Sequence, residues 1–429
     1  MQKHVSTNGE KLSFLKHISF IFTLSYKNMI TKIHGKYYDL TNFKHPAGEI
    51  PIQLAVDRDA TELFEGHHLL SDRDTLQKIL DKYEIAKPEN TIADNNIFDW
   101  DITMISDFTK DLKQIIKETF TKNNIKYSYS EWAIIALLFT AYVINLHYYY
   151  QGHYIALLFY PLTLWVFTVN IYHDASHFAL SRRPIINQLG TYSALMFSLT
   201  YCWYHQHVIG HHCFVNVLTK DPDLYHSPLY LRHTPNIRKN KYHMYQHILI
   251  WFLWLLAVPL GLVYTGFTKS IHGKPYNKVV MLSKQLTKTS MYYELIFVIL
   301  YMFIIPYVYI GNIAFVIYPY MAYSFLFMLC TQINHLTEES MEYNKNYFIH
   351  QIINSHNVAP QSALITLLTG GLNLQIEHHL MPSVCHFHLL KIQPKIRALC
   401  TKYNIKYPCS ISLWEGLQKH YRHVVKYAT

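Results

Sequence analysis

The stretch His207-Val208-Ile209-Gly210-His211-His212 is the most informative part of the sequence. Residues four apart lie on one face of an α-helix, so His207 and His211 can bind one ion together. The adjacent His212 points about 100° away and can bridge toward a second ion. Among the 28 histidines, a His-x-x-x-His pair is expected roughly twice by chance, but a His-x-x-x-His-His string only about 0.1 times. The stretch therefore predicts a metal-binding helix.

Two further histidine groups and one single histidine complete the pattern. His173-Asp174-Ala175-Ser176-His177 repeats the spacing of four, Gln375-Ile376-Glu377-His378-His379 repeats the adjacent pair, and His335 stands alone. A site that is rich in imidazole and free of thiolate favours iron, zinc or copper. Carboxylates and amides nearby are candidates to accept the ring N–H groups, or else to cap helices. These candidates are Asp174, Asn216 and Glu377.

The composition indicates that part of the chain faces lipid. Hydrophobic residues make up 50% of the chain and charged residues 15%, against about 25% charged residues in a typical soluble domain. The net charge of +10 would suggest nucleic acid as a partner in a soluble protein, but cytoplasmic loops beside anionic lipid produce the same excess, and we favour that interpretation. The six cysteines are scattered without a Cys-x-x-Cys pair, so neither a disulfide framework nor a zinc module is predicted.

The chain divides into a small soluble part and a membrane part. Residues 29–90 predict a small α+β domain with a region of alternating polarity and two helices, the second capped by Ser71. Residues 131–400 carry the apolar stretches and the histidine groups. The other expected segments are a leader at 1–28 with Met29 as an alternative start, a linker with an amphipathic approach to the membrane at 91–130, and a cytosolic tail at 401–429.

Several stretches are apolar and near the ~20 residues that a membrane-spanning helix needs. The segment 248–267 is equally apolar, but it contains Pro259 and Gly261, and both of its flanks carry lysine without acidic residues. Both flanks are therefore expected on the cytoplasmic side, with the segment re-entering rather than crossing. The histidine groups then lie at the cytoplasmic face, beside an interfacial helix over 187–203. The four expected spans are 132–149, 154–172, 293–310 and 313–331.

The three histidine groups resemble the histidine boxes of membrane fatty acid desaturases, and most closely those of the front-end class with a fused N-terminal cytochrome b5 domain. Gln375 stands where other membrane desaturases have histidine, and the string from Gly370 to Pro382 is similar to the third box of the front-end class. The stretch from Trp203 to His212, with Asn216 and Asp221-Pro222-Asp223, resembles the second box of the delta-5 branch. The resemblance implies a small α+β haem domain followed by an all-α membrane domain with four transmembrane helices, interfacial or re-entrant helices and a cytosolic histidine-rich cap.

The resemblance also implies the cofactors and their ligands. His45-Pro46-Ala47-Gly48 resembles the His-Pro-Gly-Gly haem motif, and the implied second axial ligand of a b-type haem is His68, with His67 as the alternative. A bis-histidine haem transfers electrons rather than binding oxygen. Ala47 would crowd its turn if that position needs a positive φ. Gln375 is implied as a weak or outer partner of two iron ions, whose implied ligands are His173, His177, His207, His211, His212, His335, His378 and His379.

The implied activity is oxidative. With O2 and electrons from its haem domain, the enzyme would insert a cis double bond into a polyunsaturated acyl chain, between an existing double bond and the carboxyl end, with delta-5 favoured and delta-6 next. The acyl chain would be carried by coenzyme A or by a phospholipid. NADH-cytochrome b5 reductase would donate electrons, and the endoplasmic reticulum membrane would hold the chain with its haem domain and histidine groups on the cytosolic side.

Other classes of protein stay open at this point. A sphingoid long-chain-base desaturase or a haem-fused lipid hydroxylase would use similar metal chemistry, although Gln375 argues against the hydroxylase, whose boxes keep histidine. The non-enzymatic alternatives are a membrane metal transporter and a haem-anchored electron carrier. A transporter would place its ligands near the bilayer midplane inside the spans, whereas these groups follow the spans.

Overall fold

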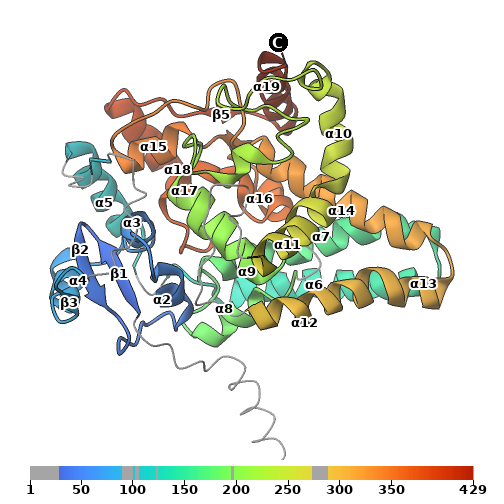
Figure 1. Cartoon of the computed structure of the whole chain (residues 1–429), viewed down its shortest axis with the longest axis horizontal. Helices are drawn as coiled ribbons and strands as arrows, with labels where there is room; N and C mark the ends of the chain where they lie inside the picture. The colour runs from blue at the N-terminus through green and yellow to red at the C-terminus, as the bar shows by residue number, and fades with distance from the viewer. Residues whose placement is uncertain are drawn as a thin grey trace, which may run out of the picture.

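The chain folds into a small N-terminal part and a larger helical part whose long helices project to one side (Figure 1). The computed structural model describes residues 29–88, 100–101, 106–121, 124–194, 198–272 and 288–428. The expected leader at 1–28 lies outside these residues.

The N-terminal part is a three-stranded antiparallel sheet with short helices packed around it (Figure 1). The central strand β2 (Lys36–Asp39) pairs with β1 (Ile30–Ile33) on one side and with β3 (Glu84–Ile85) on the other. The last helix begins after Asp72, whose carboxylate accepts the backbone N–H three residues on, and not after Ser71 as the sequence suggested. The helices are α2 (Ile50–Ala55), α3 (Thr61–His67) and α4 (Arg73–Leu80).

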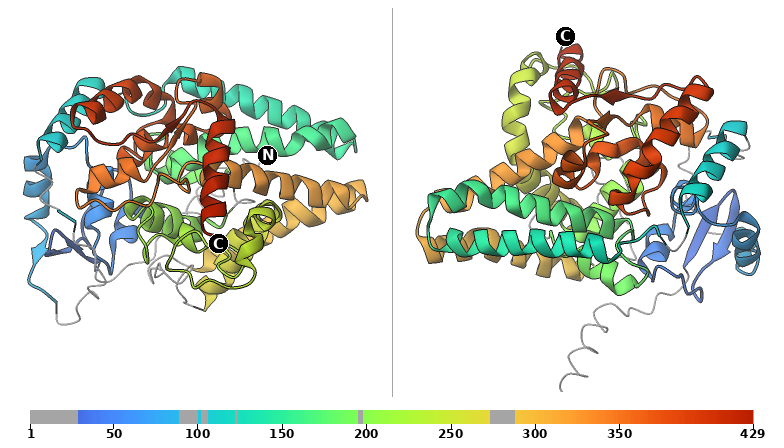
Figure 2. Two further views of the ribbon diagram at one scale, coloured as in Figure 1. Left: turned by 90° about the horizontal axis from the view of Figure 1, so that it is seen from above. Right: turned by 180° about the vertical axis from the view of Figure 1, so that it is seen from behind.

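Long apolar helices form the body of the second part. Within the described residues, five helices are long and apolar enough to cross a membrane, and they expose large apolar side chains such as Leu137, Ile155 and Val308. Such a surface suits lipid rather than water. Four of the helices run side by side at the positions expected from the sequence (Figures 1 and 2). They are α6 (Tyr129–Tyr150), α7 (Tyr154–Ser176), α12 (Lys288–Ile299) continued by α13 (Ile305–Ile310), and α14 (Ala314–Gln332).

The remaining apolar helix contains the segment that was expected to re-enter. It consists of α10 (Gln246–Leu256), a π-helical stretch (Ala257–Thr265) and α11 (Gly266–Ile271), so the chain stays helical through Pro259, where a break was expected. Proline interrupts helical hydrogen bonding, and bends commonly occur at prolines and at π-helical turns. In Figures 1 and 2 α10 lies across the direction of the other four helices, so it does not join them as a parallel span.

Shorter helices cover the polar end of the bundle. The segment expected as one interfacial helix over 187–203 contains α8 (Pro184–Gly190) and α9 (Thr200–Trp203) instead. From the expected linker, α5 (Asp107–Thr119) packs its apolar side against the C-terminal helices. Those helices are α15 (Tyr347–Ile353), α16 (Ala363–Thr369), α17 (Gln375–Leu380), α18 (His386–Lys402) and α19 (Leu413–Lys426).

A tight glycine turn seats α17 between α7 and α18. Gly370 and Gly371 both have positive φ angles, 58° and 79°. A Cβ on Gly370 would lie 2.8 Å from the carbonyl oxygen of Val169, and one on Gly371 would lie 2.3 Å from the Cβ of His386. Only glycine combines this conformation with so close an approach. The turn therefore brings the histidines of α17 against the polar end of α7.

Candidate metal centre

Buried imidazole rings from four separate segments converge at the polar end of the bundle. His173 lies in the last turn of α7 and His177 follows it, while His335 follows α14. The rings form two groups. The five-ring group consists of His173, His177, His207, His212 and His378. The three-ring group consists of His211, His335 and His379.

The central stretch is a π-helix, Tyr204–His211, and this changes which rings meet. His207 belongs to the five-ring group and His211 to the three-ring group, whereas their spacing suggested one shared ion. A π-helix closes its hydrogen bonds over five residues, so its turn is wider than that of an α-helix and residues four apart are offset. The adjacent pairs at 211–212 and 378–379 are each divided between the two groups.

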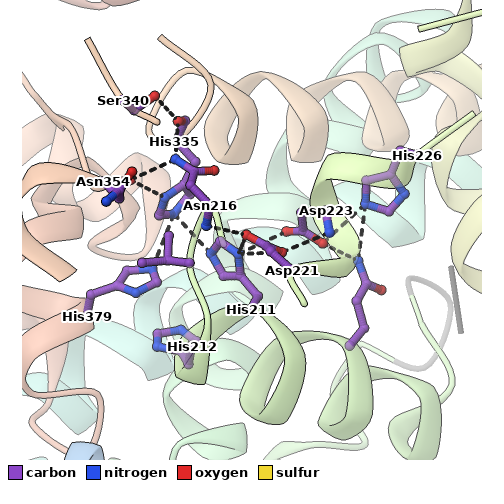
Figure 3. Close-up of polar contacts among 12 residues, drawn as sticks. His211, His212, Asn216, Asp221, Asp223, His226, His335, Ser340, Asn354 and His379 are labelled. Carbon is purple, nitrogen blue, oxygen red and sulfur yellow. Dashed lines mark hydrogen bonds and ion pairs between the residues drawn. The ribbon is translucent and has the colours of Figure 1, made fainter. Parts of the chain in front are cut away.

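Each ring of the three-ring group donates its Nδ1–H to a fixed acceptor, and Figure 3 shows those of His211 and His335. The pairs are His211 with Asp221 Oδ2 at 3.1 Å, His335 with the Asn354 carbonyl at 3.3 Å, and His379 with Gln351 Oε1 at 2.9 Å. The amide of Gln351 is oriented by its Nε2, which donates to the carbonyl of His212 at 3.0 Å. The opposite ring nitrogens therefore carry lone pairs. His335 Nε2 lies 3.2 Å from that of His211 and 3.3 Å from that of His379.

Lone pairs that face one another at this distance need a cation between them. Metal–nitrogen bonds of about 2.1 Å place neighbouring ligand nitrogens about 3.0–3.4 Å apart. In the five-ring group the Nε2 atoms of His173 and His207 are 3.2 Å apart, and those of His212 and His378 are 3.1 Å apart. Both groups therefore fit a transition-metal ion, and an all-imidazole donor set suits iron.

Gln375 lies at the edge of the three-ring group. Its amide nitrogen is 2.7 Å from Nε2 of His335, and its Oε1 is buried and has no hydrogen-bond partner within the described part of the chain. Amide orientation follows the hydrogen-bond network, so a metal ion would favour the flipped amide. The flipped amide would turn its oxygen toward the three lone pairs.

Two of the expected acceptors, Asp174 and Glu377, accept hydrogen bonds from groups other than the eight rings. Asp174 accepts a hydrogen bond from Nδ1 of His386 at 2.8 Å and another from its backbone N–H at 3.1 Å. Glu377 accepts from Nδ2 of Asn357 and from the hydroxyl of Tyr407, both at 2.7 Å. Asp174 thus fixes α18 to α7, and Glu377 ties α17 to the segment that precedes α19.

Asn216 acts on the backbone around the three-ring group. Its Nδ2 donates to the carbonyls of His335 at 2.9 Å and Asn354 at 3.2 Å, and its own N–H donates to Asp221 at 2.8 Å. It adopts a left-handed conformation with φ 52°, which asparagine tolerates better than most residues. Asn216 therefore connects two of the ring acceptors without touching a ring.

Sequence reasoning missed the side chains that α15 and α18 contribute. Gln351 lies on α15, Asn354 follows that helix, and no motif marked either of them. His386 lies outside the three histidine groups of the sequence, yet it contacts Asp174. His205, two residues before His207, is fully buried, and its Nδ1 bonds to the carbonyl of Tyr201.

The N-terminal part contains a second, smaller histidine site. The rings of His45 and His68 face each other with centroids 5.9 Å apart and planes at 87°. Nδ1 of His68 donates to the carbonyl of Phe64 at 2.8 Å, which leaves Nε2 as a lone-pair donor for a metal. Burial, with a smaller effect from the charge of His68, lowers the pKa of His45 to about 4. Two rings that face each other in this arrangement fit the axial positions of one haem.

The turn after His45 tolerates alanine. The positive φ of the turn belongs to Gly48, at 92°, and Ala47 is not among the residues with positive φ. The expected crowding by Ala47 is therefore absent. Its backbone N–H donates to Nδ1 of His45 at 3.1 Å.

His67, the alternative haem ligand, faces away from His45. Its ring lies beside that of His177 in the five-ring group, with centroids 6.1 Å apart and planes at 27°. It also contacts the ring of Phe178 edge-on. The two neighbouring histidines at the end of α3 therefore face different sites. His68 faces His45, and His67 faces the larger histidine site.

A small apolar cavity, with about 20 Å³ of free space, adjoins the five-ring group. His173 and His207 form part of its wall, and the indole of Trp203 stacks on His207 with centroids 4.2 Å apart. Thr168 and Tyr323, also in the wall, satisfy each other through a hydroxyl hydrogen bond of 2.8 Å. The wall is therefore apolar beside two of the rings, which is the lining that a hydrocarbon chain requires.

Comparisons with known proteins agree with this architecture. Residues 150–410 match the model of the fatty acid desaturase family, and residues 23–88 match that of the cytochrome b5-like haem/steroid-binding domain.

Several characterised relatives are similar over nearly their whole length. A probable Delta(5) fatty acid desaturase C of Dictyostelium discoideum is 28% identical over 90% of this chain and 89% of its own. An acyl-lipid (8-3)-desaturase of Physcomitrium patens is 28% identical over 92% and 87%. An acyl-lipid omega-13 desaturase of Chlamydomonas reinhardtii is 25% identical over 87% and 88%.

The matched domains account for both histidine sites. A cytochrome b5 domain implies haem, and the desaturase family uses a pair of iron ions. The apolar helices account for the lipid-facing surface. The chain therefore belongs to the fatty acid desaturase family, as a multi-pass membrane oxidoreductase with a fused cytochrome b5-like domain.

Proposed function

We propose that the chain is a front-end desaturase that inserts a cis double bond at the delta-5 position of a polyunsaturated acyl chain, with delta-6 as the second choice. The observation that carries this proposal is the apolar cavity whose wall includes His173 and His207. The names of the Dictyostelium and Physcomitrium relatives support the front-end position. The omega-13 relative is similar over a comparable length, and its name gives a different position of the double bond. Experiment therefore has to determine the position for this chain.

The eight rings of the two groups are the proposed iron ligands, with Gln375 as a weak partner of the three-ring group. Bound there, the iron pair would activate O2 for removal of two hydrogens from the acyl chain. The balance is one –CH2–CH2– unit, one O2, two electrons and two protons giving one –CH=CH– unit and two water molecules. The proposed axial ligands of the haem that delivers the electrons are His45 and His68.

The protein's own contribution is to position the acyl chain and exclude water. Each methylene buried in the cavity contributes about 0.8 kcal/mol to binding. Trp203 fixes the plane of His207 by stacking, and the hydroxyls of Thr168 and Tyr323 bind each other rather than water. The depth at which the chain stops would then decide which carbons lie beside the rings.

The partners and location follow from the same proposal. We favour an acyl chain carried by a membrane lipid over one carried by coenzyme A, because the Physcomitrium and Chlamydomonas relatives are named acyl-lipid desaturases. NADH-cytochrome b5 reductase is the proposed electron donor. The endoplasmic reticulum, with both histidine sites on the cytosolic side, is the proposed location.

Expression in a host fed 18- and 20-carbon polyunsaturated acids tests the activity. Chromatography of the host lipids should show a new double bond nearer the carboxyl end, first in lipid-bound chains. A hydroxylated acid, or an altered long-chain base with unchanged fatty acids, would assign the chain to a hydroxylase or to a sphingoid-base desaturase instead.

Single substitutions separate the two histidine sites. His378→Ala should abolish the product while the haem absorbance stays, because His378 lies in the five-ring group far along the chain from the haem site. His45→Ala should remove the haem absorbance. His153→Ala is the matched control, since its exposed ring caps no helix. Haem absorbance that survives His45→Ala would contradict the axial assignment.

A further inference from the structure

His67 forms a contact between the haem domain and the larger histidine site. It ends α3, one residue before His68, and its ring lies 6.1 Å from that of His177, measured between centroids. The contact belongs to a packed interface in which Leu54 of α2 clusters with Phe178 and Val208. The haem domain is therefore seated against the segments that carry the metal-binding rings.

Hydrogen bonding fixes the tautomer of His67. Its Nδ1 lies 3.1 Å from the carbonyl of Leu63 and must donate, because a carbonyl can only accept. A neutral ring then carries a lone pair on Nε2. That atom is buried and has no hydrogen-bond partner among the residues that the structure describes.

His177 needs an acceptor for a ring N–H group. Both of its ring nitrogens are buried and without a hydrogen-bond partner in the described ranges. A metal-bound imidazole uses one nitrogen for the ion and donates the other N–H to an acceptor. The three-ring group shows this arrangement at every ring, through Asp221, Asn354 and Gln351.

We propose that His67 is a positioning residue that accepts the N–H of metal-bound His177, directly or through one water molecule. The inference rests on the proposed function, since it takes His177 as an iron ligand and His68 as a haem ligand. A bridging water is nearly as favourable as a direct hydrogen bond. Docking of the haem domain thereby completes the surroundings of the five-ring group.

The same placement sets the path between the two sites. A haem held by His45 and His68 would supply electrons one at a time, twice for each double bond, to iron held beside His177, and His67 itself would gain and lose nothing. The covalent link from His68 to His67 and the contact from His67 to His177 are short. His67 therefore couples electron delivery to the orientation of one ligand.

The test compares two substitutions in the full-length membrane enzyme loaded with haem and iron. His67→Phe keeps an aromatic ring and removes the acceptor, and His67→Gln restores an acceptor. Loss of a partner that orients a ligating ring costs about 10–100-fold in metal affinity or activity. We expect His67→Phe to lose iron to a chelator faster, and to slow reoxidation of the dithionite-reduced haem by O2 and substrate, within that range.

The haem itself should not change. Haem content, absorbance and midpoint potential of His67→Phe should equal those of the wild type, and His67→Gln should recover most of both rates. Equal rates in His67→Phe and wild type would overturn the proposal, and so would loss of haem from His67→Phe, which would make His67 the axial ligand.

Two further comparisons keep the result interpretable. Leu54→Ala loosens the domain interface without removing the acceptor, so a loss as large as that of His67→Phe would attribute the effect to docking and refute the proposal. Iron content and haem reoxidation of the wild type test the proposed function by themselves. A wild type that binds no iron would overturn both the proposed function and the role of His67. An active wild type whose rates are unchanged by His67→Phe would overturn the role of His67 alone.

Discussion

The five-ring and three-ring groups lie side by side but are held in different ways. Every ring of the three-ring group has a hydrogen bond from Nδ1 to a side chain or carbonyl of the membrane domain. In the five-ring group, Nδ1 of His173 and His212 and both nitrogens of His177 are buried without partners within the described residues. Hydrogen bonds therefore orient the rings of the three-ring group without a metal ion. The five-ring group depends instead on the number of its rings and on the segments that contact it.

The difference follows from the segments that surround each group. The three-ring group faces α15 and the loop at 216–223, whose polar side chains supply acceptors. The five-ring group faces the apolar cavity on one side and the haem domain on another. Acceptors beside the cavity would draw water toward the acyl chain, so fewer hydrogen bonds around these rings suit a site for hydrocarbon oxidation.

Removal of a single ring should have the largest effect and should distinguish the groups. His379→Ala leaves two rings and Gln375 in the three-ring group, whereas His173→Ala leaves four rings in the five-ring group. We expect both variants to lose desaturation, but His379→Ala to lose about half of the iron and His173→Ala to retain most of it. Elemental analysis of purified protein gives the iron-to-haem ratio. Equal losses would contradict the view that ring number secures the five-ring group.

A single glutamine should matter nearly as much. Gln351 accepts from His379 and donates to the carbonyl of His212, so it bridges the two groups. Gln351→Met keeps the volume and removes both bonds. We expect iron to leave the three-ring group about 10–100-fold more readily, measured as the rate of release to a chelator.

Gln393→Met is the matched control for that substitution. Gln393 is also buried, but it donates to the hydroxyl of Tyr407, away from the rings. Its iron release should equal that of the wild type. If both variants release iron equally fast, general loosening of the cap explains the result and the bridge does not.

The sequence predicted which rings converge better than it predicted how they divide. Spacing and residue type were sufficient to single out seven of the eight rings, because chance rarely produces such strings, and the resemblance implied His335 as well. Apolar length was sufficient to locate the four parallel helices. The division of rings between groups was not predictable, since it depends on the π-helical turns of Tyr204–His211. An α-helical spacing rule gives the wrong partner for His211 there.

The supporting residues were the hardest to predict. Gln351 and Asn354 act from α15, and His386 acts from α18, far along the chain from the rings that they serve or the carboxylate that they contact. Glu377 was selected because it adjoins two rings in sequence, yet on a short helix its carboxylate points the other way, toward Tyr407. Closeness in sequence therefore identifies the rings that converge but not the groups that accept their hydrogen bonds.

A smaller effect should appear where the haem domain closes the five-ring group. Glu62 of α3 is 2% exposed. Its burial, helped by the charge of Asp59 and opposed by that of Lys220, raises its pKa to about 7. Its ordinary pKa is 4.5, so the folded state binds the proton more tightly than the unfolded state does. The stabilisation is complete below about 4.5 and is lost as the pH rises through about 7.

Glu62→Gln cannot titrate and should escape this loss. Hydrogen exchange measures the free energy of opening of α3 and its interface. We expect this free energy to fall in the wild type between pH 5.5 and pH 8 by on the order of 1 kcal/mol relative to the variant. Because His67 of the same helix lies beside His177, loosening of this interface should also make the iron of the five-ring group more labile at pH 8. A wild type and variant with parallel pH profiles would show that Glu62 stays ionised at the interface, and that docking does not depend on its proton.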